Sequence, residues 1–567
     1  MKGDRDMSAD APRPQILYSV RAQRGTTLRC KGWKQETLLR LLENNMENAE
    51  HPERLIVYGG IGKCARNWES YWALVAALQA LENDETLVVQ SGMPVAVFRT
   101  HALAPRVVMA NTNFVRPSWK TFYELQDRNL IMFAQYTAGP WEYIGTQGVI
   151  QGTFETLRSI GNLHFGGSLE GRILLTAGMG GMGGNQPRAM TMLGGITICA
   201  DVDVEMIHRR ITAGYCDVLA RSLDDALALA REAVAQNKPL GIAVVGNAVE
   251  VFEECLRRDF RPDIVTDMTP AHDPLSYIPA GHTVEGANEL RRRDRDGYFR
   301  LARASMVRQL TVMNAYHDRG AQAFEYGNQI RRQCDEEGMP DALKIPGFVA
   351  AYIRPLFLEG RGPFRWMCVS GEASDLARLD HLCLDLFADD LLITRWIGLA
   401  RRHIPIEGLP ARVCYLGFGQ RARFGLAVND LIAKGEVKGP VAFSRDNLDS
   451  GSIINPTFES EHMPDGSDVI ADWPYLNALL NASAMCDLIA IQANYAMGES
   501  VQTGVTMIAD GTAEAAFRLQ ACLTTDSGIG VVRHAQAGYD RARQVCAQHG
   551  VKVPLWWTPT ATFGPDD

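Results

Sequence analysis

Strand-like segments alternate with helical segments between residues 141 and 350, and this alternation restricts the possible folds more than any other feature of the chain. The predicted strands lie at Ile173–Ala177, 195–203, 241–248 and 263–268. A helix is predicted from near Pro187, which suits a first turn, and another over 223–237 behind the S-x-x-D pattern of Ser222 and Asp225. A third helix is predicted over 249–260. Such alternation is typical of a parallel, doubly wound α/β sheet.

A glycine-rich turn follows the first of these strands. Gly178, Gly180 and Gly183 fit G-x-G-x-x-G, and Asp201 closes the next strand eighteen residues after Gly183. This pattern is typical of dinucleotide binding, because the glycines allow a tight turn and a close approach of pyrophosphate to a helix N-terminus. An acid at the second strand end favours NAD+ over NADP+. An ordinary tight turn is the alternative, and no Tyr-x-x-x-Lys pair indicates hydride transfer.

The rest of the chain divides into two stretches around this region. We predict a core domain built from residues 1–140 and 351–567, with a Rossmann-like NAD-binding domain at 141–350 inserted between them. Predicted helices outside the insertion lie at 35–48, 72–82, 476–483 and 511–523, and predicted strands at 56–60, 85–92, 105–111, 412–419 and 487–494.

Composition narrows the class of partner. The 567 residues carry a net charge of −9, so neither nucleic acid nor an anionic membrane is expected, and a small-molecule substrate is. No run approaches the roughly 18 apolar residues of a membrane span. The twelve cysteines are scattered without a C-x-x-C pair, which disfavours a structural metal site and fits a reducing, cytoplasmic location.

Motifs along nearly the whole chain resemble those of the urocanase (urocanate hydratase) family. They are VYGGIGKCARNW, LVVQSGMPVAVFRTH, QYTAGPWEYIGTQGVIQGT, TAGMGGMGGNQP, VVGNA, VTDMTPAHDPL, EYGNQIR, IPGFVAAYIRPLF, GPFRW, LPARVCYLGFG, SDVIADWPYLNALLN and GVVRHAQAGYD. The resemblance implies a hydro-lyase that adds water to the conjugated system of urocanate, giving imidazolone propionate. It also implies tightly bound NAD+ that acts as an electrophile toward the imidazole ring through a transient covalent adduct, with no net redox change. A homodimer is implied as well.

The resemblance assigns cofactor contacts beyond the glycine turn. The matching positions are Gly59, Gly60, Gln135, Gly181, Met182, Gly183, Asp201, Asn247, Ala248, Met268, Thr269, Pro270, Ala271, His272, Tyr277, Ile278 and Tyr326. Asp201 stands where the family usually has Glu, and Met206 where Arg is common, which puts one adenosine-side contact in doubt. Met268 and Pro270 depart from the family's QTSAH, and a satisfied core histidine is the alternative for His272.

Five positions are candidates for the chemistry. Cys414 in LPARVCYLG matches the active-site cysteine of LPARICWLG, although a buried strand cysteine is the alternative. Arg365 in GPFRW is the candidate for the substrate carboxylate, because a guanidinium suits a planar anion, with a salt bridge as alternative. Asp449 is the candidate proton shuttle, with an Asx-turn as alternative. Tyr58 and Thr137 are expected to line the pocket.

Departures from the family cluster at the expected substrate wall. The segment HHGGGVGMG appears here as AIQANYAMG, with Gln492, Asn494 and Tyr495 in place of glycines and histidines. RDHLDSGS carries Asn447 instead of His, and PNRETE becomes PTFESE, which places Phe458 at an Arg position. Replacing Arg by Phe removes a cation and supplies an aromatic wall.

These departures predict an altered substrate for the same chemistry. Related branches of the family hydrate thiourocanate and S-methyl thiourocanate from ergothioneine breakdown, and an enlarged, less charged pocket suits such a sulfur substituent. Plain urocanate of histidine degradation is the alternative. Two rival classes are an NAD-dependent dehydrogenase, which would accumulate NADH, and a non-catalytic NAD-binding sensor.

Overall fold

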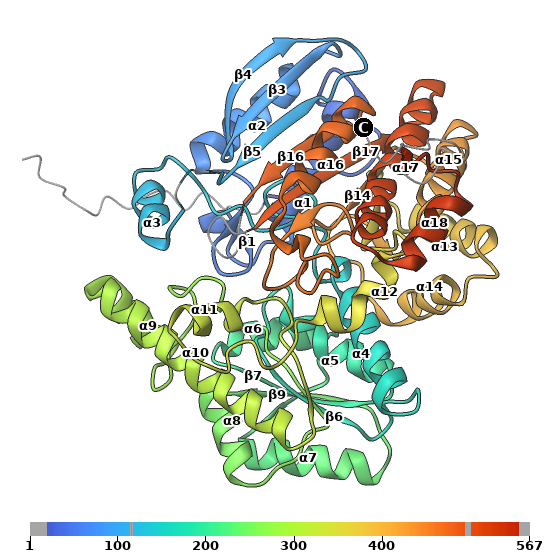
Figure 1. The fold of residues 1–567 in the computed structure, drawn as a ribbon. Helices are drawn as coiled ribbons and strands as arrows, with labels where there is room; N and C mark the ends of the chain where they lie inside the picture. The colour runs from blue at the N-terminus through green and yellow to red at the C-terminus, as the bar shows by residue number, and fades with distance from the viewer. Residues whose placement is uncertain (1–19, 114, 116, 494–499, 555–567) are drawn as a thin grey trace, which may run out of the picture.

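The computed structural model describes residues 20–113, 115, 117–493 and 500–554. They form two α/β units that lie against each other (Figure 1). The middle of the chain, drawn from cyan to yellow-green, builds the lower unit, whereas the blue N-terminal part and the orange and red C-terminal part together build the upper one. The predicted fold class, a Rossmann-like unit within a larger α/β core, is confirmed.

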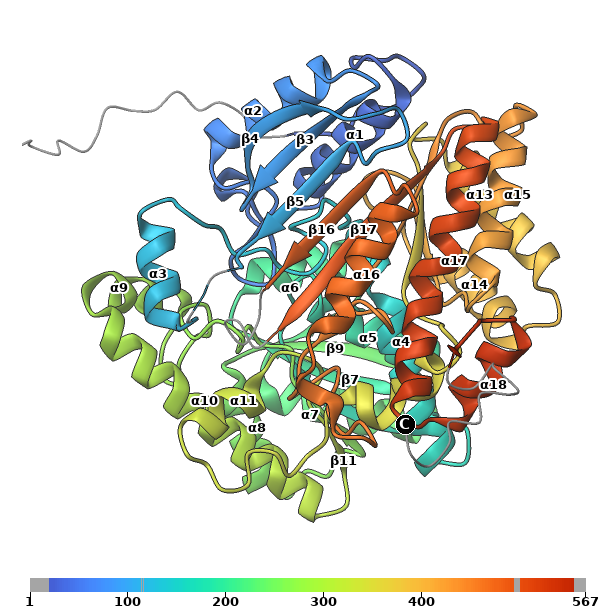
Figure 2. The ribbon, with the colours of Figure 1, turned by 45° about the horizontal axis from the view of Figure 1, so that its top comes forward.

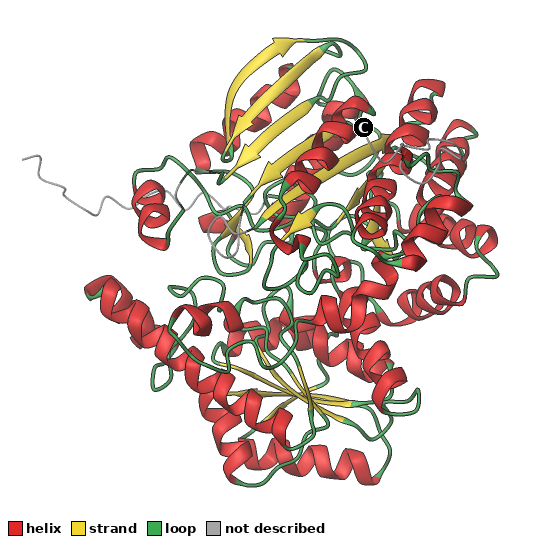
Figure 3. Cartoon of the chain, viewed as in Figure 1, coloured by secondary structure: helices red, strands yellow, loops and turns green. Residues whose placement is uncertain are grey.

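The lower unit contains a six-stranded sheet in which every neighbouring pair is parallel. Its strands in spatial order are β11 (Gln322–Ala323), β10 (Ile264–Val265), β6 (Ile173–Ala177), β7 (Ile196–Asp201), β9 (Leu240–Val245) and β8 (Val218–Ala220). Helices cover both faces of this sheet (Figure 3). They are α4 (Ile150–His164), α5 (Gln186–Met192), α6 (Val204–Thr212), α7 (Leu223–Ala235), α8 (Ala248–Arg257), α9 (Val284–Arg293), α10 (Arg295–Asp318) and α11 (Ile330–Glu336).

Local sequence accounts for several of these boundaries. All five residues of β6 are buried, as expected for a strand that is covered by helices on both faces. At the start of α7, Ser222 Oγ accepts a hydrogen bond from Asp225 N (3.2 Å), as the S-x-x-D pattern predicts. In a capping box the acid at the fourth position would accept a hydrogen bond from the backbone N–H of the cap residue, Ser222. Here the Asp225 carboxylate accepts instead from the backbone N–H of Arg221 (3.0 Å).

The upper unit is organised by a nine-stranded mixed sheet that draws on both ends of the chain. Its strands in order are β13 (Ala411–Cys414), β12 (Phe364–Cys368), β14 (Val441–Arg445), β17 (Val501–Ala509), β16 (Leu488–Gln492), β5 (Val107–Asn111), β3 (Glu85–Gln90) and β4 (Met93–Arg99), with β15 (Ile453–Ile454) paired to β17. The blue and orange strands meet where β5 pairs with β16 in parallel (Figure 2).

The same parts of the chain contribute further helices and a separate two-stranded hairpin. The helices are α1 (Trp33–Glu47), α2 (Trp68–Ala80), α3 (Trp119–Asp127), α12 (Arg354–Phe357), α13 (Ala373–Leu386), α14 (Leu391–His403), α15 (Gln420–Ala433), α16 (Asp472–Ser483), α17 (Ala513–Gln536) and α18 (Asp540–Gln548). The hairpin consists of β1 (Ile56–Tyr58) and β2 (Gly62–Lys63). Among the described residues, none of these helices combines the length and apolar character needed to cross a membrane.

Two helices of the upper unit are longer than the sequence predicts. Helix α2 begins four residues before the predicted start, because Asn67 caps it by accepting a hydrogen bond from Ser70 N (2.7 Å). Helix α17 continues thirteen residues beyond the predicted end, through Gly528 and Gly530. A side chain at Gly530 would collide with Ser450, so this glycine serves close packing against a loop rather than ending the helix.

Buried ion pairs fix β14 to the helices that cover it. Asp526 of α17 accepts hydrogen bonds from Arg445 of β14 (3.0 Å) and from the amides of Asn477 (3.0 Å) and Asn481 (2.9 Å) of α16. Burial alone would raise the pKa of Asp526, but Arg445 and further donors outweigh it and hold this pKa at about 2. A carboxylate with a depressed pKa stabilises the fold above its unfolded-state pKa, and that contribution is lost as pH falls toward 2.

We expect Asp526→Ala to lower the free energy of unfolding by about 3–5 kcal/mol, because the substitution leaves the buried Arg445 guanidinium with only a 3.6 Å contact to Asp449, an acid that Arg421 already binds through both oxygens. Urea denaturation at pH 7.5 measures the change. Asp540→Ala is the control, since the Asp540 side chain is 87% exposed and its pairing with Arg543 lies at the surface. Equal effects of the two substitutions would contradict a stabilising role for the buried pair.

Candidate functional site

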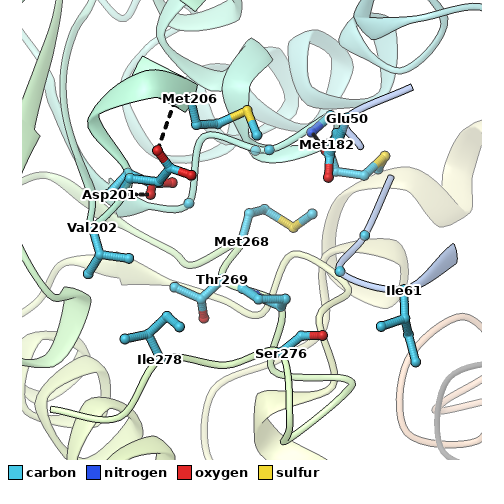
Figure 4. Close-up of a pocket in the computed structure, with 18 of the residues that line it drawn as sticks. Glu50, Ile61, Met182, Asp201, Val202, Met206, Met268, Thr269, Ser276 and Ile278 are labelled. Carbon is cyan, nitrogen blue, oxygen red and sulfur yellow. Dashed lines mark hydrogen bonds between the residues drawn. The ribbon is translucent and has the colours of Figure 1, made fainter. Parts of the chain in front are cut away.

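A pocket opens at the carboxyl ends of the parallel strands, between β6 and β10. At this point the strand order reverses, because the chain passes from β6 to β7 on one side and later returns to β10 on the other. Ligands of doubly wound folds bind at such switch points. The pocket is drawn in Figure 4, and its lining includes Glu50, Gly59, Gly60, Ile61, Gln135, Gly178, Gly180, Gly181, Met182, Gly183, Asp201, Val202, Met206, Met268, Thr269, Pro270, His272, Ser276, Ile278 and Asn328.

The glycine turn of the pocket depends on contacts between backbones. Gly178 adopts a φ of +87°, and a Cβ on this residue would collide with the carbonyl of Met268 in the loop after β10. A Cβ on Gly183 would in turn collide with the carbonyl of Gly178. Both positions therefore exclude every side chain, as the G-x-G-x-x-G pattern requires.

The turn binds a negative group of the protein itself. Glu50, which precedes the β1–β2 hairpin, directs its carboxylate at the turn and accepts a hydrogen bond from Gly181 N (2.5 Å). Figure 4 shows this side chain beside Met182 at the rim of the pocket. A carboxylate at this place stands in for an anion, so the turn has the donor geometry that a pyrophosphate needs. The residues present therefore fit a dinucleotide cofactor.

Asp201 closes β7 at the floor of the same pocket. Its two oxygens accept hydrogen bonds from the backbone N–H groups of Met179 (2.6 Å) and Asp203 (2.8 Å). Burial raises the pKa of Asp201 to about 6, although these two donors oppose the shift. Each carboxylate oxygen retains a free lone pair, so the group can accept ribose hydroxyls when it is ionised.

A hairpin and a loop form the opposite wall. A Cβ on Gly59 would lie 2.7 Å from Gln135 Nε2, and one on Gly60 would lie 2.6 Å from Ser276 Oγ. The absence of a side chain at both positions therefore lets Gln135 and Ser276 pack directly against the hairpin backbone. His272 is buried, and its Nε2 lies 2.8 Å from the carbonyl oxygen of Gly59. Burial lowers the pKa of His272, which favours a neutral ring that orders the hairpin.

Most of the predicted cofactor residues lie together. A smaller pocket continues from the floor and is lined by Asn247, Ala248, Tyr277 and Ile278, among others. Met206 borders the main pocket where the family commonly has Arg. Tyr326 lines neither pocket; its hydroxyl lies 2.6 Å from Thr153 Oγ1 in α4, at the boundary between the two units.

Two of the five chemical candidates contact each other. The hydroxyl of Tyr58 lies 3.2 Å from Thr137 Oγ1, and its ring stacks on Tyr143 with centroids 4.6 Å apart. Arg365 is buried elsewhere in the core. Its Nη2 donates to Asp446 Oδ2 (2.5 Å) and its Nη1 to the carbonyl of Glu142 (3.1 Å). The guanidinium charge is thus already paired with Asp446.

Cys414 and Asp449 lie in packed surroundings, outside both pockets. The Cys414 thiol is fully buried, and burial, reinforced by the neighbouring Cys383 thiol, raises its pKa well above the ordinary value. Both oxygens of Asp449 accept hydrogen bonds from Arg421, each at 2.8 Å. A catalytic role for either residue stays a prediction, since a neutral thiol and a doubly paired carboxylate are poorly prepared for proton transfer.

Three of the predicted specificity residues, Asn447, Phe458 and Gln492, are buried. The amide of Asn447 makes no hydrogen bond to any residue that the structure describes, although the side chain is fully buried. The Phe458 ring packs on Gly327 and lies 5.1 Å from the Phe348 ring, centroid to centroid. Gln492 Nε2 donates to the carbonyl of Tyr136 (2.6 Å). Asn494 and Tyr495 lie outside the described residues.

Two acids near the site could not be identified from sequence patterns. Glu50 reaches the glycine turn from a segment 131 positions away, a distance that no local pattern reveals. Asp446 belongs to the same RDNLDS motif as Asp449, and a motif does not show that Arg421 binds both oxygens of Asp449 whereas Arg365 binds one oxygen of Asp446. The Coulombic influence of Asp446 on the pKa values of Tyr326, Tyr415 and Glu142 places its carboxylate near all three.

Sequence profiles of one protein family cover most of the chain. The urocanase N-terminal domain matches residues 20–142, the urocanase Rossmann-like domain matches residues 145–352, and the urocanase C-terminal domain matches residues 355–548. The second match contains the six-stranded parallel sheet and the glycine turn, and the third contains Arg365, Cys414 and Asp446.

Proposed function

Because the chain belongs to the urocanase family, whose members are hydro-lyases, we propose that it adds water to a sulfur-substituted urocanate with NAD+ as its cofactor. The Rossmann-like domain is consistent with NAD binding. Thiourocanate and S-methyl thiourocanate are the proposed substrates. Plain urocanate is the alternative, and the family match supports it equally.

One observation carries the cofactor proposal: the glycine turn already holds a carboxylate on the N–H of Gly181, beside Asp201 at the end of β7. Gly178, Gly180, Gly181 and Gly183 would hold the pyrophosphate, and Asp201 the ribose. Bound NAD+ would supply an electrophilic nicotinamide ring without net oxidation of the substrate.

The aromatic wall around Phe458 supports a substituted substrate. Phe458, Phe348 and Tyr326 form a continuous row, with ring centroids 5.1 Å and 4.5 Å apart. At position 458 this row presents a phenyl ring, whereas the matching family motif has an arginine there. A thioether or thiocarbonyl group is larger and more polarisable than hydrogen, so it gains dispersion contacts against aromatic rings that an unsubstituted ring does not make.

The chain's own groups would position the substrate and move protons. The Arg365–Asp446 pair offers a guanidinium beside a carboxylate, and Asp446 retains capacity to accept a proton because its oxygens take only single bonds from Arg365 and Leu448. We therefore assign proton transfer to Asp446 rather than to Asp449. The Tyr58–Thr137 hydroxyl pair would orient the ring next to the hairpin that carries Gly59.

We expect Glu50→Gln to bind NAD+ about fivefold more tightly, which corresponds to on the order of 1 kcal/mol. The substitution removes a negative charge that competes with pyrophosphate for the N–H of Gly181. Isothermal titration of cofactor-free protein measures the affinity. Glu53→Gln is the matched control, because Glu53 carries the same charge in the same turn but does not line the pocket. Unchanged or weaker binding by Glu50→Gln would show that the carboxylate does not compete.

We expect NAD+ affinity to fall as pH drops below about 6, the pKa of Asp201. This pKa is raised above its value in the unfolded chain, so the cofactor-free fold loses stability when Asp201 ionises as pH rises through 6. Hydrogen bonds from the ribose hydroxyls to the ionised carboxylate would offset this loss. Dissociation constants measured between pH 5 and 7.5 test the trend. Asp201→Asn should bind NAD+ weakly over this whole pH range, and its affinity should not change with pH. If the affinity of Asp201→Asn for NAD+ still fell below pH 6, a group other than Asp201 would cause the pH dependence.

The substrate proposal is tested by comparing kcat/KM for urocanate, thiourocanate and S-methyl thiourocanate through loss of the acrylate absorbance. We expect a sulfur-substituted substrate to be preferred, and a preference for urocanate by more than about tenfold (1.4 kcal/mol) would overturn the proposal. Phe458→Arg should shift the preference toward urocanate, whereas Phe458→Leu keeps an apolar wall and should retain the order. NADH absorbance that grows with turnover would indicate a dehydrogenase instead.

A further inference from the structure

Cys414 and Tyr415 point in opposite directions at the end of β13. The Cys414 thiol lies against Cys383 of α13 in the hydrophobic core. Successive side chains of an extended strand alternate between its faces, so the next residue is directed to the other side. There the Tyr415 hydroxyl faces α4 of the Rossmann-like unit, 3.2 Å from the position that a Cβ on Gly152 would occupy.

The Tyr415 hydroxyl makes no hydrogen bond within the described part of the chain. The residue is only 1% exposed, but its hydroxyl oxygen is not completely enclosed, unlike that of Tyr316. Burial first, and then the nearby Tyr326, Glu155 and Asp446, raises the pKa of Tyr415 well above its ordinary value. The group therefore remains a protonated donor that is available to an acceptor.

The surroundings of this hydroxyl connect it to the cofactor pocket. Gly152 also lies close to the Tyr326 hydroxyl, 3.6 Å from its own Cβ position. From Tyr326 a hydrogen-bond chain runs through Thr153 Oγ1 (2.6 Å) and Asn185 Oδ1 (2.6 Å), and Asn185 Nδ2 donates to the carbonyl of Met182 (2.6 Å) in the glycine turn. The free donor of Tyr415 thus lies at the boundary of the two units, beside a chain that ends on the cofactor turn.

We propose that Tyr415, not Cys414, is the substrate-contacting residue of the RVCYLG motif, and that it donates a hydrogen bond to an acceptor on the ring of the substrate or on the ring's substituent. The inference rests on the proposed hydratase function. The family motif quoted above, LPARICWLG, carries Trp at this place. A tyrosine ring is smaller than an indole and ends in a hydroxyl, so the exchange both frees space for a ring substituent and supplies its donor.

The test compares Tyr415→Phe and Tyr415→Trp with the wild-type holoenzyme on urocanate, thiourocanate and S-methyl thiourocanate. Tyr415→Phe should lower kcat/KM at least about tenfold on the preferred substrate, with unchanged NAD+ content and an unchanged Tm, because it removes only a hydroxyl that makes no hydrogen bond to the described residues. Tyr415→Trp should shift the ratio of kcat/KM values toward urocanate by about tenfold or more. A purely structural role would not move that ratio.

Tyr316→Phe is the matched control. Tyr316 is also 1% exposed, and its hydroxyl likewise has no partner among the described residues, but it lies in α10 away from the unit boundary. Wild-type kcat/KM values for Tyr415→Phe on all three compounds, or equal losses in Tyr415→Phe and Tyr316→Phe, would overturn the proposal.

Equilibrium binding separates the two proposals. A wild-type protein that turns over none of the compounds but binds one, with weaker binding by Tyr415→Phe, would refute the hydratase function and retain the contact. Hydratase activity that Tyr415→Phe leaves intact would refute the contact alone. A wild-type protein that neither binds nor converts any of the three compounds would refute both.

Discussion

The parallel ladder between β5 and β16 is the interaction on which the arrangement of the site depends. It pairs Val107–Asn111 with Leu488–Gln492 and so joins the N-terminal and C-terminal parts of the chain in one sheet. At its end Asn111 Nδ2 donates to Gln492 Oε1 (3.3 Å), and Gln492 Nε2 donates to the carbonyl of Tyr136 (2.6 Å). The ladder thereby holds the segment that places Gln135 at the cofactor pocket. Loss of this pairing would release the hairpin wall as well as the sheet.

Sequence patterns predicted best the features that depend on residues close together in the chain. The β6 strand, the glycine turn and the Ser222 cap each depend on residues within a few positions of one another, and the structure contains all three. Sequence patterns predicted least well the contacts between segments that lie far apart in the chain. Glu50 meets the turn across 131 positions, and Gly530 lies within a helix because a loop needs the space. Such contacts leave no periodic or motif signal in a single sequence.

Buried acids show how far a motif can identify a chemical role. Asp449 gives both oxygens to Arg421, whereas Asp446 shares Arg365 and keeps accepting capacity. Glu142, which no motif singled out, has neither oxygen hydrogen-bonded to a described residue, and burial raises its pKa well above the ordinary value despite Arg365 nearby. Asp449 and Glu142 are each 1% exposed and Asp446 is 7% exposed, so the three acids differ more in the number of guanidinium donors that bind them than in burial.

The two units of the fold hold the glycine turn and Phe458 by separate contacts. The glycine turn and Asp201 belong to the parallel sheet, whereas Phe458 lies in a core loop that arginines hold by its backbone. Arg533 donates to the carbonyl of Ile453 (2.6 Å), and Arg354 donates to that of Glu459 (3.0 Å). Because these arginines bind carbonyl oxygens, their contacts do not depend on the side chain at position 458. A substitution of Phe458 would therefore change the aromatic row of Phe458, Phe348 and Tyr326 and leave the backbone contacts of the glycine turn in place.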